Sequence, residues 1–290
     1  MTDFANIDGR LVPREQAWIS AFDRGFLYGD SVYETIRTYG GRPFLVRRHL
    51  SRLAASAERL QLRLPNPLDE IAERVRSSVD ASGNAESLVR VILSRGASAI
   101  GLDPTLAKHP TLVMLISAFQ PLPAPAYEGG IQVQLATVVR NPIQALDPRI
   151  KTSNQLNNIL AFMEAKAANC TEAFMLNAAG ELAEGTTSNI FVVQGRRLIT
   201  PPLGAGILEG ITRELVLELA AREGIEARED SLRPEDLFQA DECFLTATTK
   251  EILPVVRVSG RVIGSGRPGP VSLQLLKAYR SRVQTLLETE

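Results

Sequence analysis

The chain has 290 residues, of which 44% are hydrophobic and 22% are charged, and its formal net charge is −1. This length suits two lobes or one large α/β domain. A nearly neutral chain gives no electrostatic reason to expect nucleic acid or a membrane as a partner, which favours small-molecule ligands. Two histidines and the distant Cys170 and Cys243 form no metal-ligand spacing, so no metal is expected. Without a visible secretory signal or an apolar run of roughly 20 residues, we expect a cytoplasmic protein.

Turn and strand signals dominate the beginning of the chain. Asp8 and Gly9 lie between apolar residues and predict a β-hairpin, because glycine adopts positive φ without steric cost. Further along, alternating residues predict strands, and apolar residues spaced by 3.6 predict helices. The expected elements are strands at 32–39, 88–94 and 112–119 and helices that begin near Arg48 and after Pro67.

A proline-rich segment at 121–125 marks the domain boundary, since proline lacks the amide donor that a central strand or helix needs. We therefore expect a small N-terminal domain over 1–120, a linker over 121–129 and a large C-terminal domain over 130–290. The elements expected in the second half are strands at 131–139, 172–176, 188–193, 242–246 and 252–258 and helices at 156–168, 212–223, 234–238 and from 271 onward.

One of the five lysines has the setting that a Schiff-base lysine needs. Lys151 follows a strand-like approach and precedes polar turn residues and a helical pattern, so its side chain should project from a bend. Such an amine could bind the aldehyde of pyridoxal phosphate and move a proton during catalysis. The alternative for Lys151 is a solvated turn lysine. The other lysines lie in a proline-rich loop, on outer helix faces and after a run of threonines: Lys108, Lys166, Lys277 and Lys250.

A single acid, Glu184, lies in an apolar strand and is the candidate partner of the pyridine nitrogen of that cofactor. Small hydroxyl and amide residues follow it up to Ser188 and Asn189, and their donors suit a phosphate or a carboxylate. The alternative is a glutamate exposed at the end of a strand.

Three further positions suit an anion. Arg52 lies among core leucines on the first long helix, and its guanidinium offers a fork of donors. Ile211 and Thr212 begin a helix, where free amides and the helix dipole favour phosphate. Thr248 and Thr249 follow an apolar strand. A surface arginine, a plain N-cap at Thr212 and a polar strand end are the respective alternatives, while His49 and His109 are interpreted as structural.

Five segments in the same order resemble the signatures of the fold type IV pyridoxal phosphate enzymes, which include branched-chain aminotransferases, D-amino acid aminotransferases and aminodeoxychorismate lyases. The resemblance covers nearly the whole chain. The segments are Asp23 to Glu34, His49 to Leu53, Glu184 to Phe191, Gly210 to Arg213 and Thr246 to Glu251.

The resemblance implies an α/β (α+β) fold, with a small N-terminal lobe and a larger lobe that has a barrel-like sheet and helices. It also implies a homodimer whose partner contributes to the substrate pocket. Its catalytic lysine corresponds to Lys151 and its ring-nitrogen acid to Glu184. The implied phosphate contacts are Arg52, Ile211, Thr212 and Thr248, and the implied substrate contacts are Tyr28, Tyr33, Arg37, Arg90, Thr248 and Thr249.

The loop over 94–103 is similar to that of branched-chain enzymes and has Ile100 and Leu102 where D-amino acid enzymes carry an arginine and a histidine. Thr35 and Gln155 depart from the branched-chain pattern. We expect a transaminase that transfers the amino group of an aliphatic, branched-chain-type L-amino acid to 2-oxoglutarate. The alternatives are a D-amino acid or another atypical transaminase, the lyase, and a non-catalytic small-molecule binding protein.

Overall fold

The computed structural model describes residues 3–289, and the chain forms two compact units. Unit 1 contains the described residues up to Gln120, together with Ile150–Asn154 and the last residues from Leu286. Unit 2 contains Pro121–Arg149 and Gln155–Thr285.

The segment expected to be a linker, 121–129, instead contains the short helix α4 (Ala124–Gly129) and belongs to unit 2. Proline is tolerated in the first turn of a helix, where its missing amide would have no acceptor. Tyr127 of this helix is buried, and its hydroxyl donates to the carbonyl of Lys250 at 3.3 Å. The segment is therefore packed as part of unit 2.

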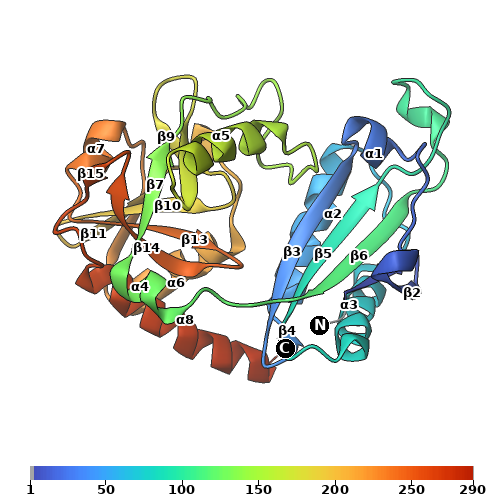
Figure 1. Cartoon of the computed structure of the whole chain (residues 1–290), viewed down its shortest axis with the longest axis horizontal. Coiled ribbons are helices and arrows are strands. Elements are labelled where there is room, and N and C mark those ends of the chain that lie inside the picture. The colour runs from blue at the N-terminus through green and yellow to red at the C-terminus, as the bar shows by residue number, and fades with distance from the viewer. Residues whose placement is uncertain (1–2, 290) are drawn as a thin grey trace. The chain divides into compact units, whose positions relative to one another are not determined.

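Unit 1 is built on an antiparallel sheet with the strand order β2-β1-β6-β5-β3-β4. Helices α2 and α3 run along one face of this sheet (Figure 1). The strands are β1 (Phe4–Ile7), β2 (Arg10–Pro13), β3 (Ser31–Tyr39), β4 (Arg42–Pro43), β5 (Ser87–Ser94) and β6 (Thr111–Ala118). The helices are η1 (Arg14–Gln16), α1 (Arg24–Tyr28), α2 (Val46–Arg59), α3 (Leu68–Ser82) and the short 3-10 turn η2 (Pro104–Leu106).

The expected hairpin at the start of the chain is confirmed. Ile7 pairs with Arg10, so the loop consists of Asp8 and Gly9, whose φ angles are 51° and 93°. Two successive positive φ angles match the right-handed twist of the flanking strands, which is why Asp-Gly is favoured in this turn.

The two faces of the sheet in unit 1 differ chemically along β3. Val32 and Ile36 point into the apolar core that the sheet forms with α2 and α3. Glu34 lies between them on the same face, because side chains alternate along a strand. Tyr33 and Arg37 consequently project from the opposite face of the sheet.

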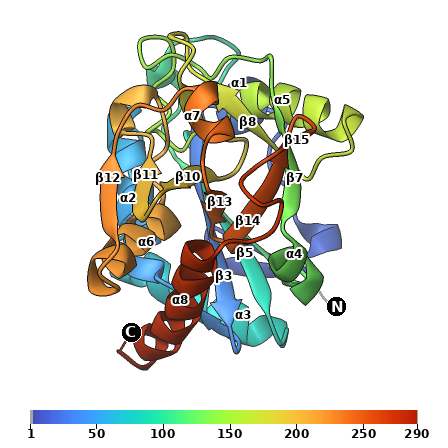
Figure 2. The same ribbon diagram turned by 90° about the vertical axis from the view of Figure 1, so that its left-hand side faces the viewer.

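Unit 2 contains a curled mixed sheet with the order β12-β11-β10-β13-β14-β7-β8-β9, and β15 pairs with β14. Strand β7 runs parallel to β14 and to β8, so segments more than a hundred residues apart lie side by side (Figure 2). The strands are β7 (Ile131–Leu135), β8 (Glu172–Leu176), β9 (Leu182–Gly185), β10 (Asn189–Gln194), β11 (Arg197–Thr200), β12 (Glu226–Glu229), β13 (Glu242–Ala247), β14 (Glu251–Val258) and β15 (Arg261–Val262). The remaining helices are α5 (Leu156–Ala167), η3 (Leu203–Ala205), α6 (Ile211–Arg222), α7 (Pro234–Phe238) and α8 (Pro270–Thr289). Within residues 3–289, no helix is both long and apolar enough to cross a membrane.

The strand expected over 131–139 is too long, because β7 ends at Leu135. The carboxylate of Glu164 accepts the backbone amides of Thr137 and Val138 at 2.7 and 3.2 Å. These amides are therefore satisfied by a side chain on α5 and not by a neighbouring strand. The approach to Lys151 is likewise irregular, so the expectation of a strand before that lysine is wrong.

Candidate active site

Lys151 lies in an extended segment along the edge of β3. Its carbonyl accepts the amide of Tyr33 at 2.9 Å, and its own amide donates to the hydroxyl of Ser56 on α2 at 3.1 Å. A β-bridge between Val32 and Thr152 continues this pairing. The backbone of Lys151 is thus held by a strand and a helix of unit 1, although the residue belongs to neither.

The side chain of Lys151 contacts an aromatic ring on the face of β3 that points away from α2 and α3. Its Nζ lies 4.5 Å from the centroid of the buried Tyr33 ring. The guanidinium of Arg90, on the neighbouring strand β5, lies 3.9 Å from the same centroid. Such distances are typical of cation–π contacts. The structure therefore brings together three of the residues predicted for the site: Lys151, Tyr33 and Arg90.

Arg37 lies two positions beyond Thr35 on the same face of β3 and is only 3% exposed. Its guanidinium is 3.9 Å from the Tyr39 ring and 4.8 Å from the Phe119 ring. Because aromatic contacts hold the guanidinium in place, its orientation is restricted even without a ligand.

Arg52 is held by a buried carboxylate on the other face of β3. Its Nε and one Nη donate to the two oxygens of Glu34 at 2.7 and 2.8 Å, which is the bidentate geometry that guanidinium and carboxylate favour. Nδ1 of His49 lies 2.7 Å from the same carboxylate. Glu34 therefore fixes the fork of Arg52, which the sequence predicted as a phosphate ligand.

Burial would raise the pKa of Glu34, but the charge and hydrogen bonds of Arg52 and His49 outweigh burial and hold that pKa well below its ordinary range. Burial lowers the pKa of His49 in spite of the neighbouring carboxylate. An ionised carboxylate only accepts hydrogen bonds, so the neutral His49 must carry its proton on Nδ1. The cluster of Glu34, His49 and Arg52 then has no net charge.

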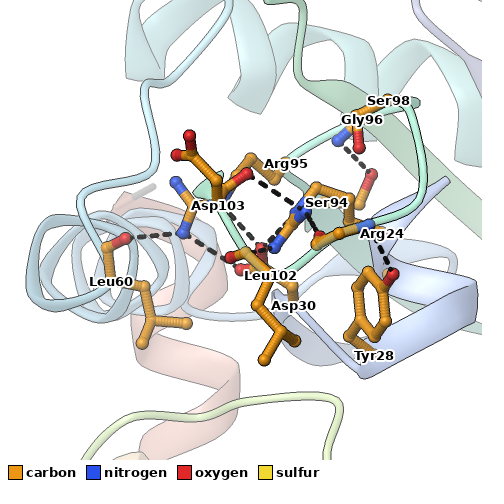
Figure 3. Close-up of polar contacts among 12 residues, drawn as sticks. Arg24, Tyr28, Asp30, Leu60, Ser94, Arg95, Gly96, Ser98, Leu102 and Asp103 are labelled. Atoms are coloured by element: carbon orange, nitrogen blue, oxygen red, sulfur yellow. Dashed lines mark hydrogen bonds and ion pairs between the residues drawn. The ribbon is translucent and has the colours of Figure 1, made fainter. Parts of the chain in front are cut away.

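Tyr28 belongs to a different cluster, shown in Figure 3, which anchors the loop after β5. Its hydroxyl accepts the amide of Gly101 at 3.1 Å. The buried Arg24 donates to the carbonyls of Gly101 and Leu102 at 2.7 and 3.1 Å and to the carboxylate of Asp30 at 2.9 Å. Arg24 thus ties the backbone of this loop to α1, while the side chains of Ile100 and Leu102 are 75% and 80% exposed.

In unit 2, Glu184 is a buried acid on β9 with a defined set of partners. Oε1 accepts Nε of Arg140 at 2.8 Å, and Oε2 accepts the amide of Leu208 at 2.8 Å. The amide nitrogen of Asn189 lies 3.5 Å from Oε2 and donates at 3.0 Å to the carbonyl of Leu208. The solvent-exposed strand-end alternative for Glu184 is therefore wrong.

Helix α6 begins close to Asn189. Its N-cap is Gly210, and no side chain of residues 3–289 caps the helix, so the simple interpretation of Thr212 as the N-cap is wrong. A Cβ on Gly210 would lie 1.9 Å from Oδ1 of Asn189, so only glycine fits this approach. The first amides of a helix lack intrahelical acceptors. Ile211 and Thr212 are the first residues of this turn and are both buried.

The remaining predicted residues of unit 2 lie on two turns. Thr248 and Thr249 are half-buried in the turn between β13 and β14. Ser188 is buried immediately before β10, and its hydroxyl donates to Glu172 at 3.3 Å. Because the Ser188 hydroxyl already donates its single proton to Glu172, it cannot also donate to an anion. Ser188 could then offer an anion only its backbone amide.

Two partners in these clusters were not predicted from the sequence. Arg140 lies in an irregular segment and is 44 residues from Glu184, so no local pattern could have shown the pair. The sequence does contain a sign of Glu34. It is a charged residue at a position of β3 where the alternating pattern places apolar, core-facing residues. A buried charge requires a partner, and Arg52 and His49 provide it.

Unit 1 contains a lysine next to an aromatic ring, and unit 2 contains a buried acid and a helix start without a side-chain cap. Each is a kind of group that can bind a small anionic cofactor. The family model for class IV aminotransferases matches residues 31–258, and the chain belongs to this family of amino-group-transferring enzymes.

Individual relatives agree with the family model. A Methanocaldococcus jannaschii protein provisionally named as a branched-chain-amino-acid aminotransferase is 38% identical over 94% of both chains. A D-alanine aminotransferase of Bacillus licheniformis is 30% identical over 95% of both chains.

Solved structures agree as well. A branched-chain amino acid aminotransferase from the organism abbreviated T.th., solved with pyridoxamine 5′-phosphate, has a TM-score of 0.94 and 30% identity, covering 99% of this chain and 95% of that chain. The complex of that enzyme with N-(5′-phosphopyridoxyl)-L-glutamate has a TM-score of 0.92, with the same identity and coverage. The mixed α/β architecture of the two units is thus that of the branched-chain aminotransferases.

Proposed function

We propose that the chain is a pyridoxal 5′-phosphate-dependent transaminase that transfers the amino group of an aliphatic, branched-chain-type L-amino acid to 2-oxoglutarate. The observation that carries this proposal is the placement of Lys151 Nζ 4.5 Å from the Tyr33 ring, next to Arg90. It combines a reactive amine, an apolar wall and a cation for a carboxylate on one face of a sheet. The similar enzymes named for branched-chain substrates support the aliphatic donor, and the glutamate adduct in one of them supports 2-oxoglutarate as acceptor.

The residues present fit pyridoxal 5′-phosphate, the cofactor of class IV aminotransferases. A carboxylate accepts about four hydrogen bonds, and the contacts of Glu184 to Arg140, Leu208 and Asn189 use three of them. Glu184 therefore retains acceptor capacity for one ring N–H. At the start of α6, the glycine N-cap leaves backbone amides that suit a phosphate.

We assign the residues of this site to the cofactor as follows. Glu184 would hold the proton of the cofactor's ring nitrogen, and the phosphate would be held by Arg52 with Ile211, Thr212 and Thr248. Ser188 and Asn189 would also line the cofactor site, and Asn189 orients Glu184. When bound, the cofactor supplies an electron sink for the substrate's α-carbon and stores the amino group between the two half-reactions.

Lys151 is the catalytic base in this assignment. Its Nζ accepts the proton from the substrate's α-carbon and returns a proton later in the cycle. Arg37, Arg90, Thr248 and Thr249 would receive carboxylates of the amino acid and the 2-oxo acid, and Tyr33 and Tyr28 would contact the substrate. Arginine suits this role because its fork matches a carboxylate.

A second candidate is a D-amino acid transaminase, which the D-alanine aminotransferase relative favours. Against this candidate, the chain has Ile100 and Leu102 at the two loop positions where D-amino acid enzymes carry an arginine and a histidine. The lyase that releases pyruvate shares the cofactor residues and remains the third candidate. The amino acid that the enzyme converts distinguishes the three.

We further propose that the active form is a homodimer. Helix α5 buries its small residues Ala161 and Ala165, while Leu156, Ile159 and Met163 are 62%, 52% and 61% exposed. The exposed set follows the i, i+3, i+7 spacing of one helix face. A second copy of this nearly neutral chain is the occupant that such a face favours, because most soluble oligomers are symmetric homo-oligomers. Light scattering should give twice the mass of 31.6 kDa, and Ile159→Glu should shift the protein towards the monomer; a wild-type monomer would contradict the dimer.

The proposed activity is tested by steady-state transamination of L-leucine with 2-oxoglutarate, followed as glutamate formed. Wild type should turn over, and Lys151→Ala should lose at least about three orders of magnitude in kcat, the upper range for general acid–base groups. Lys277→Ala is the matched control, because Lys277 is exposed on α8. Activity retained in Lys151→Ala would remove Lys151 from the catalytic role.

A further inference from the structure

Glu172, at the start of β8, is a buried acid that none of the assigned roles uses. Its carboxylate accepts the Thr186 amide at 3.1 Å, the Thr187 hydroxyl at 2.9 Å and the Ser188 hydroxyl at 3.3 Å. The Thr186 hydroxyl also donates to it. Nζ of Lys250 lies 2.5 Å from Oε2. One carboxylate thus organises the whole turn between β9 and β10.

Lys250 makes this turn electrically neutral. Burial would raise the pKa of Glu172, but the charge and hydrogen bond of Lys250, with the threonine hydroxyls, lower it below the ordinary value. An ionised carboxylate has no proton to donate, so the hydroxyls of Thr186, Thr187 and Ser188 all direct their protons towards it. Without Lys250, a buried negative charge would remain next to a turn assigned to anionic ligands.

The same lysine closes the turn between β13 and β14. Its amide donates to the carbonyl of Ala247 at 3.1 Å, and Glu251 follows in the left-handed region with φ of 55°. A turn closed by a bond between its first and fourth residues and followed by a left-handed residue is common in hairpins. Arg280 on α8 binds the Glu251 carboxylate at 2.8 Å and supports the strained position. Thr248 and Thr249 are the central residues of the turn.

Lys250 therefore connects two turns that are far apart in the sequence. Its Nζ contacts Glu172 and also donates to the Thr187 hydroxyl at 2.9 Å, while its backbone belongs to the turn that carries Thr248 and Thr249. Both turns lie in unit 2. Residues on loops hold a substrate less precisely than residues on helices or strands unless other contacts fix them, so such a connection matters for a site on loops.

We propose that Lys250 is a positioning residue of the substrate site. Its ion pair with Glu172 holds the 247–251 turn against the 186–188 turn, so that Thr248 and Thr249 present a fixed and neutral surface to the carboxylate of the amino acid and of the 2-oxo acid. This inference rests on the proposed function, because that proposal places Thr248 and Thr249 among the residues that receive the substrate carboxylate. Lys250 touches no reacting atom and acts through the turn.

The test compares Lys250→Met with wild type and with Lys277→Met, a matched exposed lysine on α8. In Lys250→Met we expect KM for both L-leucine and 2-oxoglutarate to rise about tenfold, with kcat changed less than about threefold. The cofactor dissociation constant, measured by titration of its absorption band, should rise less than KM does, because Thr248 is one of four residues assigned to the phosphate and the other three lie outside this turn. Lys250→Arg should restore most of the substrate affinity, since arginine also pairs with a carboxylate.

A single substitution that leaves Glu172 charged could prevent folding, because an unpaired buried charge is costly. The double variant Glu172→Gln/Lys250→Met removes both charges and should fold, and it should show the same rise in KM. Unchanged KM in a folded Lys250→Met or in the double variant, against an active wild type, overturns the positioning role. No conversion of L-leucine by wild type would instead overturn the proposed function.

Discussion

The carboxylate of Glu184 binds the guanidinium of Arg140 at 2.8 Å, and the two residues are 4% and 8% exposed. Arg140 is further held by the side-chain oxygens of Asn157 and Asn158 at 3.2 and 3.4 Å. The acid assigned to the ring nitrogen is therefore oriented by protein groups alone. A carboxylate fixed at this position can stabilise a protonated pyridine ring.

Replacement of Arg140 tests whether the pair supports the fold. Arg140→Met leaves Glu184 buried without its cation, and breaking a buried pair in this way costs about 3–5 kcal/mol. We expect the free energy of unfolding, measured by urea denaturation, to fall by about that amount. Arg196→Met is the control, since Arg196 is exposed and should lie within about 0.5 kcal/mol of wild type. Equal midpoints for the two variants would show that the pair contributes nothing.

Glu184→Gln tests the electrostatic role of the acid. The amide has a similar shape but carries no charge, so it cannot hold a proton on the ring nitrogen. We expect the absorption band of the bound cofactor to remain and kcat to fall about 10²-fold or more. Turnover close to that of wild type would contradict the assignment of Glu184.

The elements that the sequence predicted well are those whose signals are local. β8 over Glu172–Leu176 and α7 over Pro234–Phe238 lie where expected, because a short apolar run and an N-terminal proline determine them. β11 and β12 were not expected. β12 has only four residues, Glu226–Glu229, with a polar sequence, and its strand character depends on parallel pairing with β11, which no local pattern reveals.

The candidate site divides in the same way. Lys151, Glu184 and Arg52 were predicted from local context and from family resemblance. The partners that orient them depend on tertiary contacts: Arg140 is 44 residues from Glu184, and Lys250 is 78 residues from Glu172. Lys250 was recognised only as a lysine after threonines at a strand end. A buried charge in a strand predicts that some partner exists but does not identify it.

The lowered pKa of Glu172 makes stability depend on pH in a defined direction. A carboxyl group with a depressed folded-state pKa stabilises the fold above its ordinary value, near 4.5, and loses this contribution as the pH falls through its folded-state pKa. We compare Glu172→Gln with wild type by denaturant unfolding at several pH values. The variant should be less stable by about 3 kcal/mol between pH 6 and 8, and the difference should shrink below about pH 4.5. A difference that is constant down to pH 3 would contradict this expectation.

Arg24 should control the order of the loop that carries Ile100 and Leu102. Arg24→Met removes the donors to the carbonyls of Gly101 and Leu102, while Asp30 keeps its ion pair with Arg95 at 2.7 Å. Hydrogen bonds to charged groups contribute about 1.5–3 kcal/mol, so amide hydrogen exchange over 97–106 should accelerate about tenfold or more. Arg10→Met, an exposed position on β2, should leave this exchange unchanged. Equal protection in both variants would show that Arg24 does not hold the loop.

The most direct test of the central claim is a half-reaction measurement on the purified protein with bound cofactor. The loss of the cofactor's absorption band is followed after separate addition of L-leucine, L-glutamate and D-alanine. Lys151→Ala is treated in the same way and should show no comparable conversion. We expect rapid loss with L-leucine and L-glutamate and little with D-alanine. Conversion by D-alanine alone, or a protein that binds no cofactor, would contradict a branched-chain-type transaminase.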